Sequence, residues 1–281
     1  MLLDKPTGIS SARAVAQIKR LLPKKTKIGH TGTLDPLASG LLILLIGRAT
    51  RLSRYVTGLD KTYTATAHFG AVSDTLDAEG EITELDTPTP TEEDLRSAAR
   101  DFTGELLQTP PMASAVKVGG ERLYNVHRRG ETVERESRPV TIHSLDLGAY
   151  EPPHATFEVS CSSGTYVRTL ISDLADSLDN GAYLTALRRN SVGNLNLRDA
   201  NLPEEITESA IHNRIIHSSR VVENLPAVTV GEDERDDVLH GRSIAARGIP
   251  GSFRVQFDGE LLAIYRDEEG RARPEVVLCA A

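Results

Sequence analysis

The 281-residue chain has no tryptophan, only two cysteines and two methionines, and an aromatic content of 4%. Two cysteines cannot form the disulfide framework of a small secreted domain, so we expect Cys161 and Cys279 to be packing residues in a reducing cytoplasm. No group of Cys and His has the spacing of a zinc site, and no metal is predicted. The first residues lack the features of a secretory signal. These absences favour a cytoplasmic protein.

Long hydrophobic runs are also missing. The longest apolar run, residues 41–46, is far too short to cross a bilayer, so no membrane partner is predicted. A hydrophobic content of 39% and a charged content of 26% are typical of a globular protein. A chain of this length can bury one large core and carry a small second domain.

Charge is distributed unevenly along the chain, whose net charge is −8. Residues 12–54 carry nine Lys and Arg side chains against the single acid Asp35, whereas residues 74–105 carry eleven acids against two arginines. A charge run is often only a solvated face, but a basic segment this dense is what phosphate binding requires. The candidate RNA contacts in it are Lys19, Arg20, Lys24 and Lys25.

The isolated carboxylate of Asp35 lies in the loop of residues 29–40, which reads GHTGTLDPLASG. Three glycines and a proline in twelve residues indicate unusual backbone angles or a close approach to a ligand. The loop leads directly into the apolar run 41–46, which we predict to be a buried strand. A polar loop on a rigid strand is a typical position for chemistry.

Periodicity and capping signals predict a mixed α/β fold. Strand 61–69 should place Tyr63 on one face and Thr62 on the other, and Thr91 with Asp94 should form a capping box before a helix. The expected helices are 12–22, 49–56, 95–102, 166–178 and 203–218, and the other expected strands are 140–147, 155–161 and 183–187.

Two further segments differ from this pattern. We predict that residues 110–139 form a basic segment that extends from the core and acts as a flap. Its candidate phosphate contacts are Arg122, Arg128 and Arg129. After residue 224 come short strands with tight turns, including an Asp-Gly hairpin signal at 258–259. We therefore predict a catalytic domain over 1–224 and a small β-barrel-like domain over 225–281.

The loop 29–40 resembles the catalytic motif of the bacterial tRNA pseudouridine-55 synthase family (TruB). The resemblance continues through DKPTGIS at 4–10, KTY at 61–63, CSSGTYVR at 161–168 and LRR at 187–189, in the family's order. The tail resembles the family's PUA-like RNA-binding domain more weakly. Met1 lies only three residues before the first of these motifs, so we expect the start of a strand to be missing.

The resemblance implies the isomerisation of one uridine in the T loop of tRNA to pseudouridine, without a cofactor. Asp35 then corresponds to the catalytic carboxylate, Arg168 to the cation that keeps it ionised, and Tyr63 to the tyrosine that stacks on the base. An adjacent Arg typically lowers the pKa of an Asp by about 1–3 units. Tyr166, Leu187 and His30 correspond to residues around the flipped nucleotide. Residues 110–139 correspond to a thumb-like insertion.

Two alternatives remain open at this point. One is an RNA-binding or RNA-folding module without catalysis, and the other is a synthase that depends on a guide RNA. The thumb-like insertion favours an enzyme that acts on tRNA with no obligatory protein or guide RNA. We also expect the chain to be a monomer.

Overall fold

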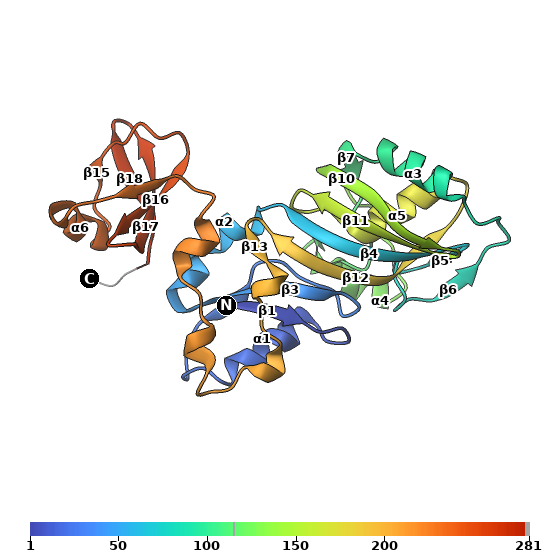
Figure 1. Cartoon of the computed structure of the whole chain (residues 1–281), viewed down its shortest axis with the longest axis horizontal. Helices are drawn as coiled ribbons and strands as arrows, with labels where there is room; N and C mark the ends of the chain where they lie inside the picture. Colours follow the sequence, from blue (N-terminus) through green and yellow to red (C-terminus); the bar gives the residue numbers. More distant parts are fainter. Residues whose placement is uncertain (115, 279–281) are drawn as a thin grey trace.

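The computed structural model describes residues 1–114 and 116–278. A large part built on a nine-stranded mixed sheet carries the N-terminus, and a smaller C-terminal part is built on a five-stranded sheet (Figure 1). The predicted mixed α/β fold is confirmed. Cys161 is buried in the core as predicted, whereas Cys279 lies outside the described residues. No helix among the described residues is long and apolar enough to cross a membrane.

The large sheet joins strands that lie far apart in the sequence. Its main path in spatial order is β1 (Leu2–Lys5), β3 (Ser39–Ile46), β12 (Ala182–Val192), β4 (Lys61–Phe69), β11 (His154–Cys161), β10 (Arg138–Glu151) and β7 (Gly104–Gln108), with β2 (Ile28–His30) on β3 and β13 (Leu195–Asn196) on β12. All of these pairs are antiparallel except β12 with β3, which run parallel. The parallel junction brings two segments of the resemblance, 29–40 and 187–189, together.

Strand β3 is buried on both faces, which explains its continuous apolar sequence. Leu42 and Leu44 belong to the main core, while Leu41, Ile43 and Leu45 belong to a second core on the opposite side. Strand β4 alternates as predicted, with Tyr63 buried and Thr62 on the more exposed face. The parallel junction is therefore formed by the buried strand β3 and by β12, which is paired on its other edge with the regular strand β4.

Helices α3 and α5 pack their apolar residues into the main core. Helix α3 begins with the predicted capping box, in which the Thr91 side chain and backbone amide both bond to Asp94. The regular helices are α1 (Ser11–Lys19), α2 (Ser53–Thr57), α3 (Glu92–Asp101), α4 (Leu123–Arg128), α5 (Val167–Asp176) and α6 (Glu232–Leu239). Only the second half of the helix expected at 49–56 is α-helical and belongs to α2. Its first half belongs to the 3-10 segment η1 (Gly47–Leu52).

The helix expected over 203–218 is wrong. This stretch holds a chain of 3-10 segments, η3 (Pro203–Glu205), η4 (Ile211–Arg214) and η5 (Ser218–Val222), preceded by η2 (Leu197–Asp199). Its β-branched and Ser, Thr and Asn residues have weak helix propensity. The segments follow the sheet edge instead, where Ile206 and Ile211 are buried in the main core.

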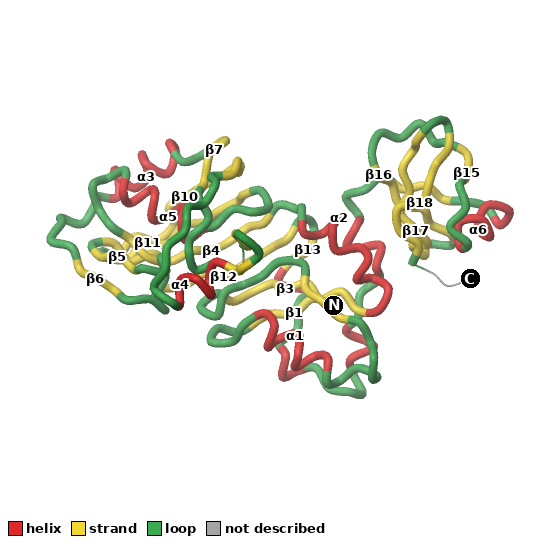
Figure 2. Tube along the Cα trace, turned by 180° about the vertical axis from the view of Figure 1, so that it is seen from behind, coloured by secondary structure: helices red, strands yellow, loops and turns green. Residues whose placement is uncertain are grey.

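The predicted flap contains a short hairpin, β8 (Lys117–Val118) with β9 (Glu121–Arg122), followed by α4. It has a small apolar cluster of its own around Met112, Leu123 and Val126. Seen from behind, α4 lies beside β12 of the large sheet (Figure 2). The acidic loop before α3 carries a second small hairpin, β5 (Ala71–Ser73) with β6 (Ile82–Glu84).

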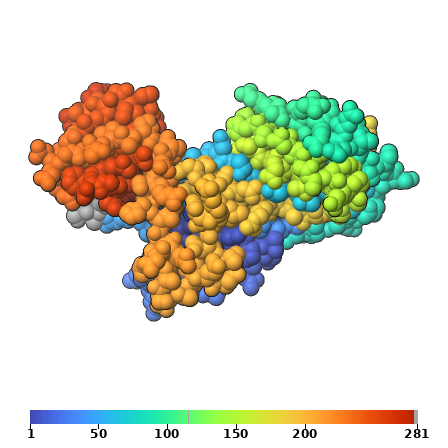
Figure 3. Space-filling view, in the orientation of Figure 1, coloured from blue at the N-terminus to red at the C-terminus, as the bar shows by residue number. Residues whose placement is uncertain are grey.

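The C-terminal sheet curls into a half-barrel with its own core around Phe253 and Tyr265. Its strands are β14 (Ala227–Thr229), β16 (Ser252–Phe257), β17 (Glu260–Glu268), β18 (Arg271–Val277) and β15 (Ile244–Ala245). The hairpin predicted at Asp258-Gly259 is confirmed, with both residues at positive φ. The sheet forms a separate lobe (Figure 3), which contacts the large part through Ile264 and Val276 in the second core.

Candidate active site

Asp35 lies in the loop between β2 and β3, and helix α1 holds this loop in place. The Ser11 hydroxyl accepts a hydrogen bond from the Leu34 amide (2.8 Å) and donates one to the Leu34 carbonyl (2.9 Å). The Gly8 amide donates to the Pro36 carbonyl at 2.8 Å. Ser11 and Gly8 therefore hold the backbone on the two sides of Asp35, and the Gly8 bond gives the 4–10 motif a physical role.

Arg168, in the first turn of α5, forms an ion pair with Asp35, as the resemblance implies. Its Nη2 lies 2.9 Å from the Asp35 carboxylate, and its Nη1 lies 2.9 Å from the carboxylate of Asp77. Nη1 also donates to the Thr75 carbonyl (2.7 Å) and Nη2 to the Ala113 carbonyl (2.8 Å). Because all these acceptors surround a side chain that is only 5% exposed, the guanidinium has one fixed orientation.

The charge balance at Asp35 differs from expectation. The resemblance predicts that the adjacent Arg holds its pKa low, but burial raises the pKa of Asp35 above its ordinary value of 3.8, and Arg168 only partly opposes this. The nearby negative charge of Asp77 raises the pKa further. The Asp35 side chain is 39% exposed, and the residue lines a cavity.

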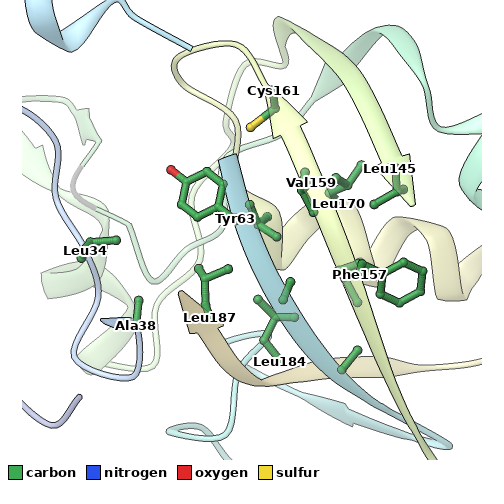
Figure 4. Close-up of a cluster of buried hydrophobic side chains, with 14 of the residues drawn as sticks. Leu34, Ala38, Tyr63, Leu145, Phe157, Val159, Cys161, Leu170, Leu184 and Leu187 are labelled. Carbon is green, nitrogen blue, oxygen red and sulfur yellow. The ribbon is translucent and has the colours of Figure 1, made fainter. Parts of the chain in front are cut away.

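The cavity has a volume of about 260 Å³. Three of the predicted site residues, Tyr63, Tyr166 and Leu187, line it together with Asp35 and Arg168. Figure 4 shows the Tyr63 ring between β4 and the loop that carries Leu34 and Ala38. The other lining residues are Thr31, Gly32, Thr33, Leu34, Ala38, Thr57, Lys61, Ser114, Gly164, Thr165, Val167 and Arg189.

Tyr63 and Arg189 face each other across the β4–β12 pair. Burial raises the pKa of Tyr63, against the positive charge of Arg189, so the phenol stays protonated. Arg189 donates from Nε to the Leu41 carbonyl (2.7 Å) and from Nη2 to the Gly32 carbonyl (3.1 Å). This side chain therefore joins β12 to both ends of the Asp35 loop.

Tyr166 and Leu187 are positioned by their own elements. The Tyr166 amide and carbonyl both bond to the side-chain amide of Gln108, at 2.7 Å and 3.1 Å, just before α5 begins. Leu187 follows an irregularity in the β12 register and is 9% exposed. Both side chains give the cavity apolar wall area on either side of Asp35 and Arg168.

His30 is not among the residues that line the cavity. It ends β2, one residue before the lining begins, and burial together with the charge of Arg189 lowers its pKa. Its role beside a nucleotide stays a prediction. The candidate RNA contacts Lys19, Arg20, Lys24 and Lys25 are all exposed on α1 and the turn that follows it.

The arginines of the insertion are exposed but unequal. Arg129 pairs with Glu121 at 2.6 Å and with Glu131 at 3.1 Å, whereas Arg122 and Arg128 lie over the ring of Tyr124, at 5.9 and 5.7 Å from its centre. Arg122 and Arg128 are thus the better candidates for phosphate contacts.

Several residues of the site, which line the cavity or contact Arg168, are not singled out by the sequence. Arg189 and Lys61 both lie inside segments of the resemblance, so that signal could have identified them. In the sequence, Asp77 is one of the eleven acids of residues 74–105, and no local pattern distinguishes it from its exposed neighbours. Ser114 is buried and comes from the insertion, which therefore contributes to the cavity itself.

Comparison with known proteins agrees with this geometry. Residues 19–167 match the family described as "TruB family pseudouridylate synthase (N terminal domain)", and residues 225–279 match "tRNA Pseudouridine synthase II, C terminal". The chain belongs to the TruB family. The tRNA pseudouridine synthase B of Cupriavidus metallidurans is 42% identical over 98% of this chain and 92% of its own length. That of an Arthrobacter species is 40% identical over 99% and 95%.

Solved structures outside this set of relatives have the same fold as this chain. A chain in the crystal structure of a Cbf5–Nop10–Gar1 complex superposes with a TM-score of 0.76 at 24% identity, over 99% of this chain and 84% of that chain. At this identity the likeness supports the fold alone. Four of the five quoted motifs of this chain, all except 4–10, contribute lining residues to one cavity.

Proposed function

We propose that this chain converts uridine 55 in the T loop of tRNA to pseudouridine, with Asp35 as the catalytic carboxylate. The observation that carries the proposal is the carboxylate of Asp35, which lines a cavity beside the buried Arg168, with Tyr63, Tyr166 and Leu187 as its walls. A cavity of about 260 Å³ takes one nucleotide and no duplex, so the target base must leave its stack. Contact with aromatic and apolar walls offsets part of the free-energy cost of unstacking the base.

The reaction needs an ionised Asp35 on the ribose side of the base. The N1–C1′ bond breaks, the uracil turns, and C5 bonds to C1′; the proton on C5 is lost and N1 gains one. Asp35 acts either by attacking the sugar or by removing a ribose proton, and both routes need its carboxylate. Arg168 orients that carboxylate and opposes the effect of burial on its pKa.

The basic surface supports tRNA as the substrate. Residues 12–54 place exposed Lys and Arg side chains on α1 and its following turn, and the insertion adds Arg122 and Arg128. Phosphate contacts of this kind position an RNA without reading its sequence, while unstacked loop bases are read in pockets. We further propose that the chain acts as a monomer in the cytoplasm, without a guide RNA.

The Asp35→Asn variant tests the catalytic assignment. It should bind tRNA with the affinity of the parent protein and form no pseudouridine, because an amide can neither attack the sugar nor take a proton from it. Pseudouridine is mapped in an unmodified tRNA transcript after incubation with purified protein. Normal turnover by this variant would reject Asp35 as the catalytic group.

The same assay distinguishes the alternatives. Conversion of the bare transcript with no other component present excludes a guide-dependent enzyme. Release of tritium from C5-labelled uridine in that transcript excludes a non-catalytic RNA-binding module. Conversion at a uridine outside the T loop would contradict the proposed position.

A further inference from the structure

Two buried cations line the cavity without a carboxylate partner. The Lys61 ammonium donates to the carbonyls of Thr57 (2.9 Å) and Leu59, and the Arg189 guanidinium bonds to backbone carbonyls of the Asp35 loop and β3. Within residues 1–114 and 116–278, neither forms an ion pair, unlike Arg168, which pairs with two carboxylates. The cavity therefore has one wall on which opposite charges are paired and one positive wall, formed by Lys61 and Arg189.

The positive wall is costly to maintain. Lys61 is 7% exposed and Arg189 is 2% exposed, and buried charges without partners are strongly destabilising. An ammonium has three N–H donors, and two backbone carbonyls occupy two of them at Lys61. Burial and the charge of Arg189 lower the pKa of Lys61 to about 8, which shows how unfavourable its surroundings are for positive charge. An anion in the cavity would relieve this.

Sheet geometry places the two cations beside Tyr63 and Leu187, the walls proposed for the base. In β4, Lys61 lies two residues before Tyr63 and shares its face; in β12, Arg189 lies two residues after Leu187. Arg189 is the direct cross-strand neighbour of Tyr63. The aromatic and apolar walls proposed for the uracil thus belong to the same surface as the two cations.

The proposed reaction supplies an anion at this place, and the inference rests on that proposed function. When the N1–C1′ bond breaks, N1 keeps the electron pair, and the uracil carries one negative charge spread over N1, O2 and O4. The charge disappears when C5 bonds to C1′, the C5 proton leaves and N1 is protonated. We propose that Lys61, supported by Arg189, stabilises the negative charge on the detached uracil.

The test compares uridine with 5-fluorouridine at the target position of the tRNA. Fluorine withdraws electrons, so the detached 5-fluorouracil is a less basic anion and needs less stabilisation. Lys61→Gln keeps donors for the Thr57 and Leu59 carbonyls but removes the charge. Its single-turnover rate should fall by about 10²–10³-fold with uridine. With 5-fluorouridine, followed as consumption of the nucleoside, the loss should be at least about tenfold smaller.

Leu187→Ala is the matched control, because it removes wall area from the same surface without changing charge. It should slow both substrates by the same factor. Lys61→Met serves as a second neutral variant if Lys61→Gln does not fold, and Lys61→Arg, which restores the charge, should recover most of the lost rate. Affinity for the tRNA should stay at the wild-type value in all Lys61 variants.

Equal losses with the two substrates would overturn the inference, as would an unchanged rate in both neutral variants. A weaker tRNA affinity with a shallower salt dependence would assign Lys61 to a backbone phosphate instead, and would also overturn it. Failure of the unchanged protein to convert uridine at all would contradict the proposed function itself, so the two failures are distinguishable.

Discussion

At the scale of single residues, the protonation of Asp35 depends on its burial and on three charged neighbours, Arg168, Asp77 and Lys5. Burial and the negative charge of Asp77 raise its pKa, while Arg168 lowers it. Arg168 cannot neutralise Asp35 fully because it also binds Asp77, which is 3% exposed and has no solvent to replace that partner. The decrease of the reaction rate at acidic pH should therefore depend on these opposing effects on the pKa of Asp35.

We expect the single-turnover rate to fall on acidification with a midpoint above 3.8, the ordinary pKa of Asp, because the ionised form is the active one. Asp77→Asn should move this midpoint to lower pH, since it removes a negative charge that raises the pKa of Asp35. The measurement is the rate of pseudouridine formation against pH. Asp74→Asn, which changes an exposed acid of the same loop, should leave the midpoint in place; an upward shift in Asp77→Asn would contradict the assignment.

Ser11 offers a second prediction at this scale. Ser11→Ala removes both hydrogen bonds to Leu34 and leaves two backbone groups of the Asp35 loop unsatisfied. We expect a loss of about 1–3 kcal/mol in the free energy of unfolding and a lower single-turnover rate. Ser10→Ala removes only the N-cap of α1, so it should cost about 1 kcal/mol with the rate unchanged. Urea unfolding and the rate assay together separate the two roles, and equal rates in both variants would argue against a clamp.

At the scale of elements, the parallel contact of β3 with β12 decides where the catalytic loop lies. Gly40 has φ +100° at this junction, and a Cβ there would lie 2.7 Å from the Arg189 amide nitrogen. Only glycine permits both the backbone angle and the close approach. The junction also places Arg189 where it reaches the Asp35 loop.

Gly40→Ala should therefore lower the free energy of unfolding by about 1–3 kcal/mol and reduce the rate, because β12 must move away from β3. Gly29→Ala is the control in the neighbouring strand β2, since a Cβ added there would meet nothing within 4 Å and its φ is not left-handed. Both are measured by urea unfolding. An effect of the same size in Gly29→Ala would show that the loop is simply intolerant of side chains.

At the scale of the whole molecule, the net charge of −8 hides a basic run over residues 12–54 and an acidic run over residues 74–105. The insertion carries further exposed arginines, and its backbone is bonded to Arg168 through the Ala113 carbonyl. The proposed RNA contacts of the insertion and the orientation of Arg168 therefore involve one continuous backbone segment. The C-terminal lobe joins the same body through Tyr55, whose hydroxyl donates to Glu275 at 2.7 Å.

The insertion yields a prediction about salt dependence. Arg128→Gln should weaken tRNA binding and reduce the slope of log affinity against log salt by about 0.7–0.9, the value for one phosphate contact. Arg129→Gln should change both much less, because Glu121 and Glu131 already neutralise Arg129. Affinity is measured over a range of salt concentrations. The reverse order of effects would assign the phosphate contact to Arg129.

Local patterns in the sequence are sufficient for the features that depend on near neighbours. They predict the alternation of β4, the Thr91–Asp94 capping box, the Asp258-Gly259 hairpin and the buried strand β3, because hydrophobic period, caps and turns act over a few residues. The prediction for the stretch 203–218 is wrong because its apolar spacing resembles a helix, while its conformation is determined by packing against the sheet edge, which no local pattern contains.

The sequence by itself also determined which loop carries the isolated carboxylate and, through the resemblance, that Arg168 is its partner. Only the tertiary structure decided that Asp77 shares Arg168, that Arg189 reaches across the parallel junction to the loop, and that Lys61 and Arg189 form a positive wall without carboxylate partners among the described residues. These contacts join residues from separate elements, and their energies depend on burial. Both are set by how the strands assemble and not by any short stretch of chain.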